Sequence, residues 1–162
     1  MLETINNFLT KEVFSNIKKN FDSNFAWFYQ DSTGNKTDKS NYYFSHILFD
    51  NNESKSPYFN SILMPILGKL NFNYLHRAKL NLYTKREKQI KTASHVDFEK
   101  PHTVALFSFN TNNGYTEFED GYKIKSIENT MVLFSGNLKH RSVNQTDENI
   151  RINLNINIKN VI

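Results

Sequence analysis

The sequence predicts an α+β fold that is mainly β, in which helices come first and an antiparallel sandwich or jelly roll follows. Apolar residues recur at helical spacing in the first part of the chain, up to about residue 74. Two later segments, residues 77–83 and 151–158, alternate instead with a period of two, which is typical of strands. Turn sequences lie between these segments at hairpin intervals, at Asn112-Asn113-Gly114 and at Asp120-Gly121.

Two helices are expected in the first part of the chain. One spans residues 11–21 with Thr10 as its N-cap, since a threonine hydroxyl can accept a hydrogen bond from the first helical N–H groups. The other runs over about residues 57–70, where Pro57 suits the first helical turn. Pro65 falls inside this second helix and is expected to kink or divide it, because proline cannot donate to the helical ladder.

Four further segments are expected to be extended. Residues 25–29 are aromatic and apolar, which predicts a short buried strand. Residues 42–50, 102–110 and 130–134 are rich in residues that favour strands. Residues 31–39 are polar and contain glycine, which predicts a loop.

The two alternating strands each have one aliphatic face and one polar face. The aliphatic face consists of Ala78, Leu80, Leu82, Ile152, Leu154, Ile156 and Ile158. The polar face consists of Lys79, Asn81, Tyr83, Arg151, Asn153, Asn155 and Asn157. We expect the two helices to cover the aliphatic face. The polar face looks either into water or into a hydrated cavity, and short asparagine and tyrosine side chains favour the cavity over a solvated face.

Length and composition limit the class of protein. With 162 residues and 38% hydrophobic residues, the chain is expected to be one folded domain, residues 1–162. Within it, residues 1–74 are a helical or mixed support region and residues 75–162 are the jelly-roll core. The chain contains no cysteine, which excludes disulfides, thiolate metal sites and a cysteine nucleophile.

Charge and hydropathy indicate where the protein acts. The net charge of +4 leaves a nucleic-acid partner open but does not favour it, because the lysines are scattered along the chain. Residues 1–10 lack a secretory signal pattern, and the longest apolar run, residues 62–67, is far too short to span a membrane. A soluble cytoplasmic protein without a membrane partner is expected.

His95-Val96-Asp97 is the motif that carries the chemistry. On an extended chain, residues 95 and 97 project to the same side, so the imidazole and the carboxylate can bind one ion. His140, which follows the predicted strand 130–134, supplies a third ligand. Two histidines and one carboxylate form the facial triad that is typical of non-haem iron(II), with three coordination positions left open. Arg151 follows His140 after ten intervening residues and lies on the polar face, where its planar fork can bind a carboxylate.

This combination resembles the iron(II)/2-oxoglutarate-dependent dioxygenases of the prolyl 4-hydroxylase type over about residues 77–158. The matching elements are a strand that ends in Tyr83, the H-x-D pair His95 and Asp97, a glycine-containing turn and strand at 114–118, His140 and Arg151. The stretches NTNNGYTEFEDG and LFSGNLKHRS are most similar to the small oxygenases of bacteria and tailed phages.

The resemblance implies a double-stranded β-helix, or jelly roll, with the N-terminal helices packed on its major sheet. It further implies an enzyme in which His95, Asp97 and His140 bind Fe(II) and Arg151 binds the C5 carboxylate of 2-oxoglutarate. Oxidative decarboxylation of this co-substrate to succinate and carbon dioxide, with O2, would then drive hydroxylation of an unactivated C–H bond.

Three residues are expected to complete the co-substrate site. Tyr83 matches a strand tyrosine that hydrogen-bonds 2-oxoglutarate in prolyl hydroxylases, although the interval from Tyr83 to His95 is long here. Many relatives have serine or threonine two residues after the arginine, where this chain has Asn153, whose amide can donate to the same carboxylate. Asn81 lies on the same polar face and is expected to line the pocket with them.

The remaining features have simpler interpretations. Residues 84–94 are either a solvated loop or a lid over the substrate. Arg141 is expected at the rim, with a contact to the substrate as the alternative. Structural or exposed positions are expected for His46, His76 and His102. No role beyond a solvated turn is expected for Glu117, Glu119 and Asp120.

Three functions compete. The first is a hydroxylase that acts on a protein, a peptide or a small molecule. The second is a nucleic-acid dealkylase with the same iron chemistry; such enzymes usually have a second arginine six residues after the first, where this chain has Asn157. The third is a non-catalytic jelly-roll binding module, against which the intact set of His95, Asp97, His140 and Arg151 argues.

Overall fold

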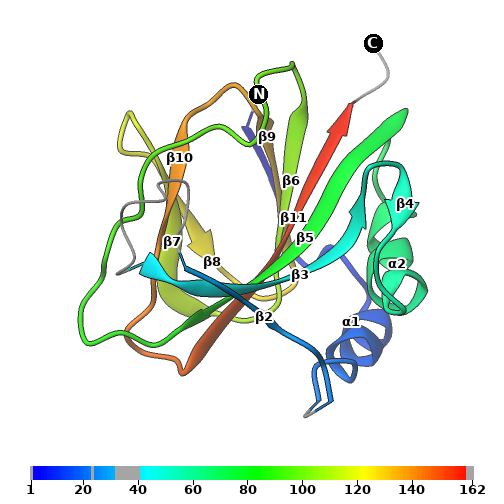
Figure 1. Cartoon of the computed structure of the whole chain (residues 1–162), viewed down its shortest axis with the longest axis horizontal. Helices are drawn as coiled ribbons and strands as arrows, with labels where there is room; N and C mark the ends of the chain where they lie inside the picture. The colour runs from blue at the N-terminus through cyan, green and yellow to red at the C-terminus, as the bar shows by residue number, and fades with distance from the viewer. Residues whose placement is uncertain (1, 23, 32–40, 160–162) are drawn as a thin grey trace.

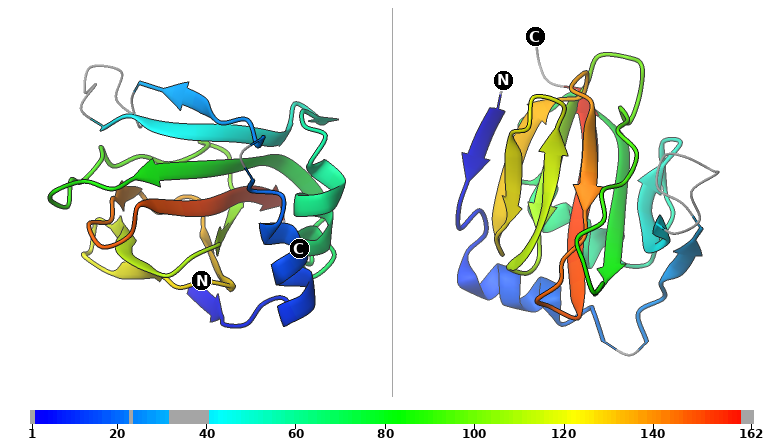
Figure 2. Two further views of the ribbon diagram at one scale, coloured as in Figure 1. Left: turned by 90° about the horizontal axis from the view of Figure 1, so that it is seen from below. Right: turned by 90° about the vertical axis from the view of Figure 1, so that its left-hand side faces the viewer.

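The protein is built in three layers, a small antiparallel sheet, a large antiparallel sheet and a layer of short helices (Figure 1). The structure is a computed structural model that describes residues 2–22, 24–31 and 41–159. Eight strands form the large sheet in the order β1-β9-β6-β11-β5-β3-β2, with β4 paired to β3, and the small sheet has the order β10-β7-β8. Figure 2 shows the small sheet in front of the large one in its right-hand view. This arrangement confirms the predicted jelly-roll architecture.

The elements have the following bounds. The strands are β1 (Leu2–Ile5), β2 (Phe28–Gln30), β3 (Tyr43–Asp50), β4 (Glu53–Ser54), β5 (Tyr74–Thr84), β6 (Thr103–Ser108), β7 (Asn112–Phe118), β8 (Lys123–Ser126), β9 (Thr130–Ser135), β10 (His140–Val143) and β11 (Ile150–Lys159). The helices are α1 (Lys11–Lys18), the π-helical turn η2 (Phe59–Leu63) and α2 (Met64–Leu67). No helix in the described ranges is long and apolar enough to cross a membrane, and the cytoplasmic location stays a prediction.

The core lies between the large sheet and the helices. Strands β5 and β11 pair along their length, so their aliphatic residues share one face, which packs on apolar side chains of α1, η2 and α2. The core residues from these elements include Phe14, Ile17, Ile62, Ile66, Ala78, Leu80, Leu154 and Ile156. The predicted role of the helices as the cover of this aliphatic face is thus confirmed.

The N-terminal helices are shorter than predicted. The hydroxyl of Thr10 accepts a hydrogen bond from Val13 N, which confirms the cap, but α1 ends at Lys18. Beyond it, the side chain of Asn20 donates to the carbonyl of Ile17 and so binds an acceptor that the helix leaves open. The expected helix over residues 57–70 is divided into η2 and α2 with Pro65 in the first turn of α2, where its missing N–H is tolerated.

The first part of the chain differs from the sequence-based expectation in two respects. The expected buried strand at residues 25–29 is instead the edge strand β2, on which Phe28 and Tyr29 are 58% and 59% exposed. Phe25, which precedes β2, is the buried member of this segment. The support region also supplies β1, an edge strand that pairs with β9 and that the sequence analysis did not identify. The loop predicted over residues 31–39 lies outside the described residues, except for Asp31.

The two predicted turns have different outcomes. Asp120-Gly121 joins β7 to β8, and Gly121 has a φ of 86°, a left-handed value that suits glycine. Asn112-Asn113-Gly114 forms no turn but begins strand β7. Space rather than backbone conformation requires the glycine there: a Cβ on Gly114 would lie 3.0 Å from Cδ of Arg151 and 3.0 Å from the carbonyl oxygen of Val143.

Residues 84–94 are hydrogen-bonded to β10 and to the segment that follows it. Lys85 N donates to the carbonyl of Asn149 and Thr92 N to that of Ser142, at 2.8 and 2.9 Å. The side chain of Lys91 binds Glu117, which is 4% exposed and also accepts from Nε of Arg141 at 2.7 Å. Glu117 is therefore a buried connector between three segments, which corrects its assignment to a solvated turn.

This connector predicts a pH dependence of stability. Hydrogen bonds from Lys91 and Arg141 hold the pKa of Glu117 below its usual range. Its stabilisation is then complete above the unfolded pKa of about 4.3 and is lost as the pH falls through the lower folded pKa. We expect Glu117→Gln to lower the unfolding midpoint at neutral pH and to flatten its fall between about pH 5 and pH 3 in thermal melts. The exposed Glu119→Gln is the control, and equal slopes in both variants would contradict the connector.

Candidate active site

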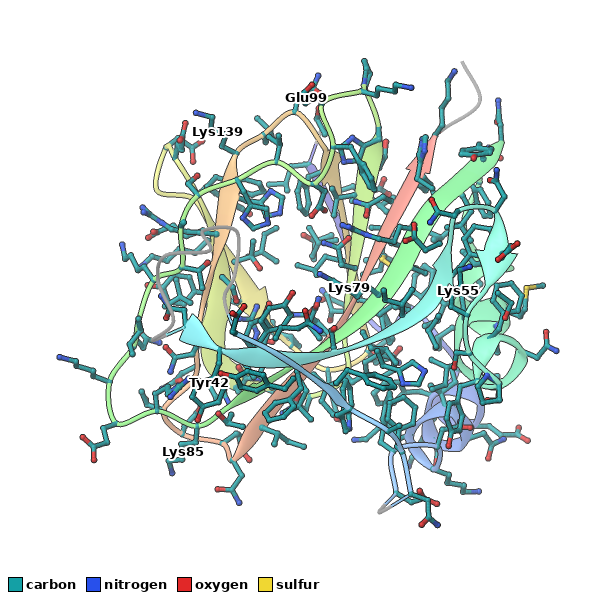
Figure 3. All side chains as sticks on the ribbon, in the orientation of Figure 1. Tyr42, Lys55, Lys79, Lys85, Glu99 and Lys139 are labelled. Atoms are coloured by element: carbon teal, nitrogen blue, oxygen red, sulfur yellow. The ribbon has the colours of Figure 1, made fainter. Side chains whose placement is uncertain are left out.

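A polar cavity of about 220 Å³ lies between the two sheets, over the polar face of β5 and β11. Side chains from β3, β5, β7, β10 and β11 line it, together with the segment around His95. Figure 3 shows Lys79 in this interior, whereas Lys85 and Lys139 lie on the outside. The hydrated cavity that the asparagine-rich face predicted is therefore present.

His95, Asp97 and His140 meet at one end of the cavity. Their nearest ligand atoms all lie within 4.8 Å of one another, and Nε2 of His95 is 3.9 Å from Oδ1 of Asp97. The two histidines are joined by mutual backbone hydrogen bonds of 2.9 Å, and His140 opens strand β10. The predicted strand through residues 95–97 is wrong, because His95 forms one isolated bridge and Asp97 lies in a bend. The two side chains nevertheless converge as the spacing predicted.

Both histidines are oriented to present Nε2. Nδ1 of His140 lies 3.0 Å from the carbonyl oxygen of Leu138, and Nδ1 of His95 lies 3.3 Å from that of Ala93. A carbonyl oxygen only accepts, so Nδ1 is the donating nitrogen in each ring, and Nε2 is the nitrogen that faces a metal. Burial lowers the pKa of His140 and so favours the neutral ring that a metal requires.

Two asparagines of β11 keep Asp97 ionised. Oδ2 of Asp97 accepts hydrogen bonds from Asn155 at 2.9 Å and from Asn157 at 2.8 Å. Burial alone would raise the pKa of this carboxyl, but the hydrogen bonds from Asn157 and Asn155 outweigh it and the pKa lies below its usual value. Because Oδ2 is occupied, Oδ1 is the oxygen available to a metal.

Arg151 is buried at the other end of the polar face. The side chain is 2% exposed, and its pKa is lowered by burial, although an arginine stays charged. Its guanidinium donates hydrogen bonds to five neutral acceptors, at 2.9–3.3 Å: Ser126 Oγ, Tyr115 O, Ser142 Oγ, Val143 O and Thr116 Oγ1. No ion pair within 4 Å involves Arg151 among the described residues. A buried cation with neutral partners is suited to an anionic ligand.

The other predicted pocket residues surround this arginine. In the register of β5 and β11, Tyr83 lies opposite Arg151 and Asn81 lies opposite Asn153. Nδ2 of Asn81 donates to Oδ1 of Asn153 at 2.9 Å, and the Arg151 guanidinium is 5.3 Å from the Tyr83 ring centre. Asn81, Tyr83 and Asn153 line the cavity directly, while Arg151 lies behind Tyr83 and the hydroxyls of Thr116 and Ser142.

Four residues of the site were given no ligand-binding role in the sequence analysis: Arg77, Lys79, Tyr43 and Asn157. Nη2 of Arg77 is 3.4 Å from Oδ1 of Asp97, and its guanidinium lies over the ring of Phe98. Lys79 points into the cavity and donates to the Tyr43 hydroxyl at 3.3 Å. Asn157, considered only as the site of a missing arginine, holds Asp97 instead. Its place on the polar face was the signal that could have identified it.

The remaining histidines and Arg141 lie away from the triad's ligand atoms. His46 is held by Ala26 O and Ser56 Oγ, and Nδ1 of His102 donates to Lys100 O. The rim position predicted for Arg141 agrees with its ion pair to Glu117.

The fold is similar to that of solved structures of 2OG-Fe(II) oxygenases. The chain matches no protein-family model and no curated protein sequence. Solved structures, in contrast, match over 98% of its length.

The particular structures are distant in sequence. An oxidoreductase of the 2OG-Fe(II) oxygenase family from Burkholderia pseudomallei is similar with a TM-score of 0.69 at 9% identity, over 85% of that chain. A Pseudomonas putida prolyl-4-hydroxylase has a TM-score of 0.60 at 11% identity, over 92% of that chain. A prolyl hydroxylase in complex with a hypoxia inducible factor peptide, from Trichoplax adhaerens, has 0.65 at 12% identity, over 83%. At this identity the likeness shows the fold.

The close packing of Gly114 on Arg151 predicts a selective loss of stability. A Cβ at this position would contact Asn112 Oδ1 at 2.9 Å and Arg151 Cδ at 3.0 Å, so the buried arginine would have to shift. We expect Gly114→Ala to destabilise the protein by about 1–3 kcal/mol in denaturant unfolding. The control is Gly68→Ala, whose Cβ meets only Met64 O at 3.5 Å and which should change stability by about 0.5 kcal/mol or less. Equal effects of the two substitutions would contradict the packing constraint.

Proposed function

We propose that the chain is one catalytic domain, residues 1–162, that acts as an iron(II)- and 2-oxoglutarate-dependent oxygenase. It would hydroxylate an unactivated C–H bond of a protein, peptide or small-molecule substrate. Two features carry this proposal: the His95/Asp97/His140 group at one end of the cavity, and the buried, ion-pair-free Arg151 directly behind the cavity wall at the other end.

The donor set fits iron(II). Two neutral imidazoles and one carboxylate are the ligands of the facial triad, which leaves positions open for a co-substrate and O2. The lowered pKa values of His140 and Asp97 favour the neutral ring and the ionised carboxylate that a metal needs. Nδ1–H bonds to Leu138 and Ala93 and the amides of Asn155 and Asn157 would fix the orientation of all three ligands.

The polar face fits a short dicarboxylate. Arg151 would bind one carboxylate of 2-oxoglutarate, with Tyr83 and the amides of Asn81 and Asn153 along its length. In the part of the chain that the structure describes, Nδ2 of Asn153 has no hydrogen-bond partner and is free to donate. Gly114 lets β7 approach Arg151 closely enough to hold it in place.

The residues supply binding and orientation, and the bound iron with 2-oxoglutarate and O2 supplies the oxidising chemistry, with succinate and carbon dioxide as by-products. Val96, Leu106 and Phe134 are the apolar residues of the cavity wall and would limit the access of water near the reacting atoms. Asp97 would stay charged throughout because its hydrogen bonds are made before any ligand arrives.

A peptide substrate has support from one comparison, because the Trichoplax adhaerens prolyl hydroxylase was solved with a peptide fragment. The dealkylase alternative is less well supported. The position of its second arginine is filled here by Asn157, which has a different task at Asp97.

The test is the visible spectrum of the anaerobic protein with iron(II) and 2-oxoglutarate. We expect a weak metal-to-ligand charge-transfer band in the wild type, because the co-substrate would bind through its 2-oxo acid group. Asp97→Ala should abolish the band, and Asp120→Ala, an equal substitution on an exposed turn, should retain it. Arg151→Met should raise the 2-oxoglutarate concentration for half-saturation by about tenfold or more, since a buried charge-assisted contact is lost.

No band in the wild type, or a band that persists in Asp97→Ala, would overturn the site assignment. Succinate release on admission of O2, without added substrate, then measures whether the assembled site is competent.

A further inference from the structure

Lys79 is a cation inside the cavity with no carboxylate partner. Its side chain is half-buried and lines the cavity, and Nζ donates a hydrogen bond to the hydroxyl of Tyr43, at 3.3 Å. Within the described ranges, no ion pair under 4 Å involves Lys79. Asp97 is the one acid among the cavity-lining residues, and its oxygens already face Arg77, Asn155 and Asn157. Desolvation of an ammonium group without a counter-ion is unfavourable, so an anion should accompany Lys79.

The proposed co-substrate does not supply this anion. The two charges of iron(II) and the charge of Arg151 are balanced by Asp97 and the two carboxylates of 2-oxoglutarate, which leaves the site neutral. Lys79 and Arg77, which both line the cavity, then leave two positive charges in excess. Arg77 lies 3.4 Å from Asp97, so Lys79 is the one of these two cations that has no ion pair among the described residues.

Lys79 also lies at the other end of the polar face from Arg151. In the strand register it is opposite Asn155, which donates to Asp97, whereas Arg151 is opposite Tyr83. Four residues along β5 separate the two cations, about 13 Å at 3.3 Å per residue. Lys79 thus belongs to the end of the cavity where the triad lies and where a substrate would have to approach.

We propose that Lys79, together with the Tyr43 hydroxyl, binds a carboxylate of the primary substrate and so selects an acidic small molecule or an acidic side chain of a peptide. This inference rests on the proposed function and names the substrate class for it. Lys79 neutralises the carboxylate, and Tyr43, which accepts a hydrogen bond from Lys79, donates its own proton to the same group. The single negative charge of a carboxylate matches the single charge of the Lys79 ammonium group.

The test measures anion binding rather than turnover. Mn(II) replaces iron, 2-oxoglutarate is saturating, and acetate is titrated while the paramagnetic relaxation of its methyl protons reports binding near the metal. We expect saturable relaxation with acetate and none with neutral acetamide. Lys79→Met should weaken acetate binding by about tenfold or more, while Lys79→Arg retains it within about threefold. Lys125→Met, which removes an exposed lysine from β8, should behave as the wild type.

The outcomes separate the two proposals. A normal charge-transfer band without saturable acetate relaxation, or acetate binding that Lys79→Met leaves unchanged, overturns the role of Lys79 alone. If 2-oxoglutarate displaces acetate, or if Lys79→Met weakens 2-oxoglutarate binding tenfold, Lys79 belongs to the co-substrate site. Either result also overturns the proposed role of Lys79 in binding the primary substrate. Absence of the band in the wild type is instead the failure of the proposed function. Comparison of acetyl-glutamate amide with acetyl-glutamine amide then distinguishes a peptide side chain from a free acid.

Discussion

The antiparallel pairing of β5 with β11 is the constraint on which the rest of the structure depends. Side chains alternate along both strands, so the register between residues 77–83 and 151–157 places the aliphatic residues of this stretch toward the helices and its polar residues toward the small sheet. The same register sets Tyr83 opposite Arg151 and Lys79 opposite Asn155. A slip of one residue would exchange the two faces and would destroy the core and the cavity together, so the stability of the fold and the composition of the site have a single cause.

Burial of so many polar groups is tolerated because asparagine amides connect the charges without adding any. Asn155 and Asn157 hold Asp97 ionised, and Asn81 is joined to Asn153 between the two charged ends. A buried amide that is hydrogen-bonded costs far less than an unpaired ion. Arg151 and Lys79 are the groups that this network leaves without a counter-ion, and they are the residues for which a ligand is proposed.

The sequence predicted those parts of the molecule that depend on local patterns. Period-two alternation identified β5, β11 and the polar cavity wall, and spacing brought His95, Asp97, His140 and Arg151 to one site. Features that depend on partners distant in the sequence were not predicted. Glu117 is buried only because Lys91 and Arg141 meet it from other segments, and β1 exists as a strand only because β9 offers it an edge. Gly114 was misread because the same residue type serves tight turns and close packing.

The hydrogen-bonded bridge between His95 and His140 has a consequence for how the site tolerates change. Each residue donates to and accepts from the other at 2.9 Å, so the separation of the two imidazoles is set by the spacing of paired extended chains. It does not depend on how many residues lie in the segments that lead to either histidine. Surface loops on both sides can therefore lengthen, shorten or diverge while the ligand geometry persists. The ligand geometry at this end of the cavity therefore depends on two backbone hydrogen bonds and not on the sequence of the flanking loops.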